Sequence, residues 1–150
     1  MNTEYTRLIP YRRHNNWVIF DRAHECVITK ELEYADFIDT SIQNCKSIKI
    51  KKDNKYAIIT SPKDLEKVNW FDELRPINKK KSLFSIRQDS RYGVIDWKGE
   101  IKITPIFDEI KDFWKQEILL VKKSGKYGVI DLRNFIFLAD CKFDHINYNL

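Results

Sequence analysis

Residues 91–96 read Arg-Tyr-Gly-Val-Ile-Asp, and residues 126–131 read Lys-Tyr-Gly-Val-Ile-Asp. More distant versions of this segment, Lys-Tyr-Ala-Ile-Ile-Thr and Asn-Trp-Val-Ile-Phe-Asp, occupy residues 55–60 and 16–21. The aromatic residues of the four segments are spaced by 39, 36 and 35 residues, and they are Trp17, Tyr56, Tyr92 and Tyr127. Self-similarity at a fixed period of this length is the signature of a repeat architecture. The sequence therefore predicts four structural units.

Two further landmarks keep the same period. A Phe-Asp-Glu-Leu segment at 71–74 recurs as Phe-Asp-Glu-Ile at 107–110 and as Phe-Asp-His-Ile at 143–146, with a fainter partner at 34–37. A strand-like apolar segment also precedes the aromatic segment, at residues 47–52, 83–88 and 119–124. We therefore expect one domain over residues 1–150, with units at approximately 6–46, 47–82, 83–118 and 119–150.

Within one unit the pattern is that of β-strands. Residues 83–87 are rich in β-formers, and residues 101–104 alternate between apolar and polar side chains. Gly99 marks a hairpin turn, and Pro105, which has no N–H donor, indicates a strand end or a sheet edge. Apolar residues do not recur at helical spacing over any long window, although residues 61–74 and 107–120 could each hold a helical turn. The predicted fold is all-β, an array of antiparallel β-meanders.

These motifs resemble the WG β-repeat of bacterial proteins, in which a Trp-Gly or Tyr-Gly pair opens a strand. Tyr92-Gly93 and Tyr127-Gly128 fill the signature pair, whereas Ala57 and Val18 replace the glycine in a degenerate first half. The resemblance implies a scaffold of short antiparallel strands without a shared catalytic residue or ligand. We expect the glycine to permit a close approach of backbone or a positive φ angle.

The four units could form an open or a propeller-like array. Residues 6–9 resemble the strand before each tight turn, so in a closed ring the two ends of the chain could pair. Closure would also remove exposed sheet edges. We expect the open, twisted array, since four units of so few strands would make a thin ring.

Composition bounds the class of protein. Hydrophobic residues make up 43% of the 150 residues, which suffices for a core, and the formal net charge is +5. No stretch approaches 18 uninterrupted apolar residues, and residues 1–16 contain no secretory apolar region, so we expect a cytoplasmic protein with no membrane partner. Three widely separated cysteines fit a reducing compartment. The abundance of lysine, isoleucine and asparagine suggests a bacterial source with an A+T-rich genome.

The sequence offers no group of residues suited to catalysis. His24 and Cys26 lie close together without a second ligand pair, so we expect no metal site. Phosphate-binding and dinucleotide-binding glycine motifs are absent from the sequence, and no cofactor is expected. The acidic pairs at 72–73 and 108–109 recur at one repeat position, which favours a structural role in which the aspartate caps its own turn. We expect no catalytic residues and no enzymatic activity.

Lysines and two tryptophans are the candidate partner-binding residues. Two lysine pairs stand at one repeat position and could stack, with Arg87 between them, into a basic stripe; the alternative is a solvated surface whose lysines protect sheet edges. The two tryptophans fall in turn-like contexts, where they could anchor an interface or pack between units. The candidate residues are Lys51, Lys52, Lys79, Lys80, Lys81, Trp97, Trp114, Lys122 and Lys123.

A binding role follows from a scaffold without recognisable catalytic chemistry. We expect a non-catalytic protein-binding repeat module, specifically a bacterial immunity protein, or antitoxin, that occludes the acidic domain of a cognate toxin. The immunity role rests on analogy with small bacterial β-repeat chains. The alternative is a nucleic-acid or regulatory binding protein that uses the lysine-rich stripe.

Overall fold

Four separate antiparallel sheets make up the chain. The computed structural model describes residues 7–38, 46–78, 81–113, 115 and 117–146. Every strand pairing within these residues is antiparallel, and the sheets contain three or four strands each. The predicted all-β repeat array is thus confirmed.

The first two sheets have three strands each. The first sheet has the order β1-β2-β3 and the second the order β4-β5-β6. Their strands are β1 (Leu8–Arg13), β2 (Asn16–Asp21), β3 (Cys26–Val27), β4 (Tyr34–Phe37), β5 (Ile48–Lys52) and β6 (Lys55–Ile59). A short 3-10 helix, η1 (Pro62–Lys67), follows β6 and stands where the third unit has the turn that contains Gly99. One of the two windows open to a helical turn therefore contains one.

The third and fourth sheets have four strands each, in the orders β10-β9-β8-β7 and β11-β12-β13-β14. Their strands are β7 (Glu73–Asn78), β8 (Leu83–Gln88), β9 (Arg91–Ile95), β10 (Ile101–Phe107), β11 (Glu109–Phe113), β12 (Ile118–Lys123), β13 (Lys126–Asp131) and β14 (Ile136–Phe143). In the second window open to a helical turn, β11 pairs with β12 over its whole length, and Lys115 after it is in a 3-10 conformation.

The sheets are out of phase with the repeat as read from the sequence. The strand after each Phe-Asp-Glu segment pairs forward: β7 pairs with β8, and β11 pairs with β12. The second, third and fourth sheets therefore each take their first strand from the end of the preceding sequence unit. The period is unchanged, but residues 73–107 and 109–143 form the sheets of the second half.

The tight turns are built by polar residues in the left-handed conformation. In the hairpins β5–β6, β8–β9 and β12–β13, both turn residues have positive φ, namely Asp53 and Asn54, Asp89 and Ser90, and Ser124 and Gly125. Two-residue loops of this conformation match the twist of the flanking strands. These turns fix the strand registers, and with them the positions of the charged residues beside the turns.

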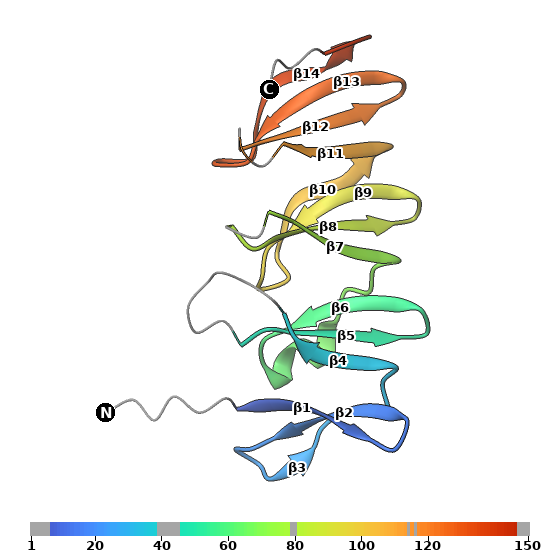
Figure 1. Ribbon diagram of the computed structural model, residues 1–150, viewed down its shortest axis with the longest axis vertical. Helices are drawn as coiled ribbons and strands as arrows, with labels where there is room; N and C mark the ends of the chain where they lie inside the picture. Colours follow the sequence, from blue (N-terminus) through green and yellow to red (C-terminus); the bar gives the residue numbers. More distant parts are fainter. Residues whose placement is uncertain (1–6, 39–45, 79–80, 114, 116, 147–150) are drawn as a thin grey trace, which may run out of the picture.

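The sheets stack in a row, and each junction has its own apolar core. Residues such as Ile48 and Ile50 pack between the first and second sheets, Phe71 and Phe84 between the second and third, and Leu119 between the third and fourth. The first and fourth sheets lie at opposite ends of the stack (Figure 1). Among the described strands β1 pairs only with β2, so the array is open and the ring does not form.

The glycine of the signature pair is needed for a close approach of backbone. A Cβ atom on Gly93 would lie 2.4 Å from the carbonyl oxygen of Ile103, and one on Gly128 would lie 2.7 Å from that of Ala139. Neither glycine has a positive φ. Of the two predicted reasons for glycine, crowding by the bulged third strand therefore applies. No long third strand crosses the equivalent residue in the described part of the first two sheets, which explains why a side chain is tolerated there.

The four leading aromatic residues occupy equivalent sites. Each pairs on one side with a basic residue and on the other with an apolar residue, the latter being Leu32, Phe71, Phe107 and Phe143 in chain order. All four are half-buried, while the residues after them fill the core. The aromatic rings therefore line the margin of each junction.

Candidate functional site

A row of basic and aromatic side chains flanks the tight turns, which lie along one long side of the stack (Figure 1). Strand register places a basic residue directly opposite each leading aromatic residue. The pairs are Arg12 with Trp17, Lys51 with Tyr56, Arg87 with Tyr92, and Lys122 with Tyr127. The ammonium groups of Lys51 and Lys122 lie 5.5 Å and 5.2 Å from the centres of the paired tyrosine rings, within the range of a cation–π contact. We call this row the hairpin ridge.

Acidic residues neutralise much of the hairpin ridge. Glu33, Glu73 and Glu109 come from the segment that starts the same sheet, and they lie 3.6 Å, 3.7 Å and 4.0 Å from the cations of Lys51, Arg87 and Lys122. These exposed pairs contribute little stability individually, but they reduce the local positive charge. The predicted basic stripe is therefore a row of mixed charge.

A second row of ion pairs runs beside the first. Lys55, Arg91 and Lys126, which precede the tyrosines, pair with Asp72, Asp108 and Asp144. Asp108 also accepts a hydrogen bond of 2.9 Å from the backbone N–H of Ser124. The prediction that this aspartate caps its own turn was wrong, because the turn it caps belongs to the next sheet. The motif thereby ties neighbouring sheets together.

The predicted partner-binding residues separate into two groups. Lys51, Lys52, Lys122 and Lys123 lie on the hairpin ridge, at the ends of β5 and β12. Lys52 and Lys123 make no ion pair with any residue in the described part of the chain. Lys81 and Trp97 lie at the opposite strand ends. Lys79, Lys80 and Trp114 fall outside the described residues.

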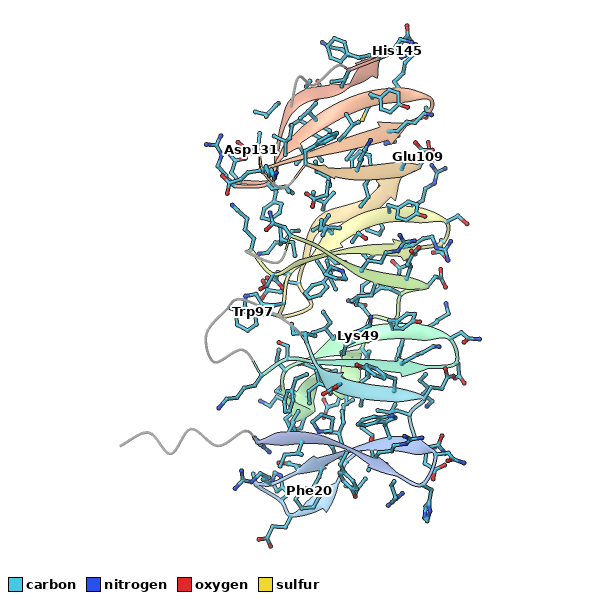
Figure 2. The ribbon with its side chains drawn as sticks, in the orientation of Figure 1. Phe20, Lys49, Trp97, Glu109, Asp131 and His145 are labelled. Atoms are coloured by element: carbon cyan, nitrogen blue, oxygen red, sulfur yellow. The ribbon has the colours of Figure 1, made fainter. Side chains whose placement is uncertain are left out.

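Lys81 and Trp97 both make contacts between sheets. The Lys81 ammonium lies 3.3 Å from a carboxylate oxygen of Glu117 and donates a hydrogen bond of 3.5 Å to the Leu132 carbonyl. Trp97 is half-buried against the core between the second and third sheets, at the edge of the stack away from the ridge (Figure 2). The packing interpretation of Trp97 thus has structural support, and its role as an interface anchor stays a prediction.

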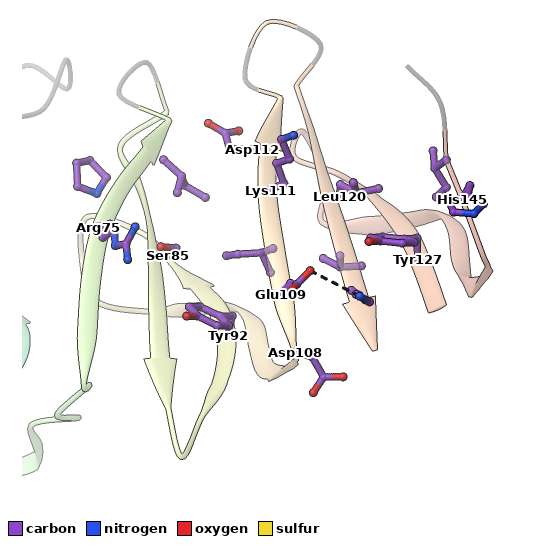
Figure 3. Close-up of a pocket in the computed structure, with 16 residues that line it drawn as sticks. Arg75, Ser85, Tyr92, Asp108, Glu109, Lys111, Asp112, Leu120, Tyr127 and His145 are labelled. Atoms are coloured by element: carbon purple, nitrogen blue, oxygen red, sulfur yellow. Dashed lines mark ion pairs between the residues drawn. The ribbon is translucent and has the colours of Figure 1, made fainter. Parts of the chain in front are cut away.

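A groove of about 890 Å³ lies between the third and fourth sheets. Its lining combines aliphatic, aromatic and charged side chains, with little net charge. The side chains drawn in Figure 3 include Arg75, Ser85, Tyr92, Glu109, Lys111, Asp112, Leu120, Lys122, Tyr127 and His145. We call this feature the inter-sheet groove. It begins beside the hairpin ridge, since Tyr92, Lys122 and Tyr127 belong to both.

Asp112 is the unusual polar residue of the inter-sheet groove. Its register partner on β12 is Leu119, a core residue, so its carboxyl group faces the third sheet, as Figure 3 shows. The Oδ1 atom is buried and has no hydrogen-bond partner in the described structure. Burial raises the pKa of Asp112 to about 6. A donor group entering the groove would satisfy this carboxylate.

Lys49 bridges the second and third sheets at a comparable site. Its ammonium donates a hydrogen bond of 3.3 Å to the Leu74 carbonyl and lies 4.9 Å from the centre of the Tyr56 ring. Burial, together with the nearby charge of Lys51, lowers the pKa of Lys49. At the junction of the second and third sheets, the Lys49 ammonium thus fills the space between the sheets.

Buried aspartates hold the turns at the other strand ends. Asp96 accepts hydrogen bonds of 2.9 Å from the backbone N–H groups of Lys98 and Glu100. Asp131 accepts one of 2.8 Å from the backbone N–H of Arg133, and the bonds from the Arg133 side chain lower the pKa of this carboxyl group. These residues end the repeated segments at 91–96 and 126–131, and their role is structural.

Residues 92–127 match a family model described as the WG containing repeat. The chain therefore contains a WG repeat. In the structure, the matched span runs from one leading tyrosine to the next, which is one full period. No curated protein matches the chain in a sequence comparison.

Metal-binding clusters and membrane-crossing helices are both absent from the described residues of this WG-repeat protein. These residues contain no group of three or more His, Cys, Asp or Glu side chains placed to hold a metal ion. None of them forms a helix with the length and apolar character of a membrane-crossing segment.

The sequence alone did not reveal the groove or the ion-pair partners. Glu73 and Glu109 were visible in the repeated motif, but their partners depend on which strand pairs with which. Asp112 carried no signal, because its burial results from the stacking of two sheets.

Proposed function

We propose that this WG-repeat protein is a non-catalytic module that binds another protein in the bacterial cytoplasm, and that it serves as an immunity protein, or antitoxin, by occluding a cognate toxin. The observation that carries the proposal is the inter-sheet groove with the buried, unpartnered Oδ1 of Asp112. A buried carboxylate oxygen without a donor costs free energy, and a partner's donor group would recover it.

The composition of the groove suits a protein ligand. Tyrosine and arginine are enriched at the energetic centres of protein interfaces, and Tyr92, Tyr127 and Arg75 line this groove. Each tyrosine is held in place by its pairing with a basic residue on the neighbouring strand. A preorganised surface of this kind loses little conformational entropy on binding.

The partner should be complementary in charge to both the hairpin ridge and the inter-sheet groove. Lys52 and Lys123 on the hairpin ridge favour acidic groups on the partner, in accord with the formal net charge of +5. Asp112 favours a single cationic or hydrogen-bonding group at the groove. An acidic toxin domain that inserts one lysine, arginine or hydroxyl side chain would meet both requirements.

Co-expression with the product of the adjacent reading frame tests this function. The expected result is a stable complex, together with protection of growth from the toxic effect of that product. Asp112→Asn should weaken binding by about tenfold, because it replaces a charged acceptor. Lys98→Ala, at the strand ends away from the ridge, should leave binding unchanged. A neighbouring product that neither binds nor harms growth would contradict the immunity role.

Nucleic-acid binding, the alternative function, is disfavoured by the ion pairs of the hairpin ridge. Six basic residues on or beside the ridge already face a carboxylate, and they are Lys51, Lys55, Arg87, Arg91, Lys122 and Lys126. Phosphate binding requires cations free to replace counterions. We expect elution from heparin at low salt with a shallow salt dependence. Tight binding to DNA, with a slope matching several phosphates, would favour this alternative over a protein partner.

A further inference from the structure

β14 is a long edge strand with uncovered apolar side chains at one end of the stack (Figure 1). Ile136 and Leu138 are 60% and 61% exposed, and Phe137 and Phe143 are each 41% exposed. Among the described strands, β14 pairs only with β13. An edge of this kind presents free backbone groups beside apolar surface, which favours the addition of another strand.

The equivalent strand of the third sheet, β10, carries edge-protecting residues that β14 lacks. The close approaches at the signature glycines align the two strands, because Ile103 and Pro105 crowd Gly93 as Ala139 and Cys141 crowd Gly128. Pro105 has no N–H to offer a neighbouring strand, and Lys102 is a charge that discourages pairing. By this alignment, Cys141 of β14 corresponds to Pro105, and Leu138 corresponds to Lys102. β14 thus has no proline along its edge, and its charged residues, Asp140 and Lys142, stand where β10 has Thr104 and Ile106.

The charges of β14 are complementary to a second β14. Asp140 and Lys142 are both exposed, lie two residues apart, and make no ion pair within the described residues. In an antiparallel pairing centred on Cys141, Asp140 of each copy faces Lys142 of the other, twice by symmetry. The same register places the small Ala139 opposite the large Phe143. Pairs of opposite charge stabilise antiparallel strands.

We propose that β14 pairs with β14 of a second copy of this chain around a twofold axis at Cys141. The two four-stranded sheets then form one continuous eight-stranded sheet. A single strand pair is a small interface, so the dimer should be weak and concentration-dependent. This inference is independent of the protein-binding function, because β14 is not among the residues that line the inter-sheet groove.

Sedimentation equilibrium of the full chain tests the dimer between about 10 μM and about 1 mM, the range of weak interfaces. The wild type should pass from monomer to dimer within this range. In this register Leu138 faces Asp144 of the other copy, so Leu138→Glu places two like charges opposite each other and should shift the midpoint at least tenfold upward. Ile101→Glu, on the equivalent strand β10, should have no effect on association, and Ile101 is also exposed, at 44%. A wild type that stays monomeric throughout would overturn the proposal, as would equal loss of association in both variants.

Charge reversal tests the register. Asp140→Lys and Lys142→Asp should each weaken self-association by about tenfold, because two attractive pairs become repulsive. An equimolar mixture of the two variants should form a heterodimer, and the double variant should regain the wild-type affinity. Circular dichroism would confirm that each variant is folded. Self-association of both single variants at wild-type affinity would overturn the register and the twofold pairing.

Discussion

At the scale of single residues, two glycines show how the close approach of a neighbouring strand restricts a position to glycine. Gly93 and Gly128 were predicted to permit either crowding or a positive φ, and the structure selects crowding. The sequence could raise both reasons, because a glycine that recurs after a tyrosine in a strand is there for its missing Cβ or for its backbone freedom. It could not choose between them, because the choice depends on where the bulged third strand crosses.

Substitution of these glycines should destabilise the fold. In Gly93→Ala the new methyl group would lie 2.4 Å from a backbone oxygen, which requires the strands to separate. We expect a loss of about 2–3 kcal/mol in the free energy of unfolding, measured by chemical denaturation. Gly125→Ala is the matched control: nothing lies within 4 Å, and only the positive φ opposes alanine, so the loss should be about 1 kcal/mol. Equal effects would argue against crowding.

Asp112 should make stability fall as pH rises. Its folded pKa of about 6 lies above the ordinary value of 3.8, so between these values the folded state binds more protons than the unfolded state. The penalty of ionisation is absent below pH 3.8 and complete above pH 6. Asp112→Asn removes it and should stabilise the chain by about 1 kcal/mol at about pH 7.5, after allowance for solvent screening.

A comparison of the wild type with Asp112→Asn at acidic pH provides the control for this prediction. Near about pH 3 the aspartate is protonated in most molecules of both states, so the wild type and Asp112→Asn should be equally stable in urea denaturation. A variant that is less stable than the wild type in neutral buffer would show that the carboxylate has a favourable partner in the folded state.

At the scale of elements, the strands and tight turns were predictable, but their assignment to sheets was not. Alternating apolar residues and turn residues such as Ser124-Gly125 specify hairpins locally. The pairing of β11 with β12 rather than with the preceding strand depends on a contact between units. The ion-pair partners of Arg87 and Lys122 could not be predicted for the same reason. They are Glu73 and Glu109, which lie on the strands β7 and β11 that pair with each hairpin from the preceding unit.

The 3-10 helix η1 should depend on one aspartate. Asp64 accepts hydrogen bonds of 2.7 Å and 3.0 Å from the backbone N–H groups of Thr60 and Ser61, and it takes the role that Asp96 and Asp131 have in other units. Asp64→Ala should cost about 1 kcal/mol, as loss of a helix cap does, measured by thermal unfolding. Glu66→Ala, in the same helix, should have little effect. A similar loss in both variants would show that helix propensity, and not the cap, is responsible.

At the scale of the whole molecule, stability should be distributed along the stack. Each junction has its own core cluster, so every sheet is stabilised mainly by its immediate neighbours. The repeat period predicted an array, and the open geometry matches the expectation for four thin units. The inter-sheet groove could not be predicted, because it exists only where two sheets meet.

Local unfolding should follow this organisation. Ile48→Ala removes a fully buried side chain from the junction of the first two sheets and should cost about 2–4 kcal/mol there. Hydrogen exchange should accelerate in β1 to β6 and stay slow in β12 and β13. Leu119→Ala, at the last junction, should give the opposite pattern. Uniform acceleration across the chain in either variant would indicate a single cooperative unit.

The forward pairing of each Phe-Asp-Glu segment has a consequence for shortening or lengthening the protein by recombination. A break between β11 and β12, where the tyrosine-led repeat divides in the sequence, would separate two strands of one sheet. A break at Asp72 or Asp108 would pass between intact sheets. Modules exchanged among proteins of this kind should therefore be joined at the aspartate, so that each graft carries a complete sheet.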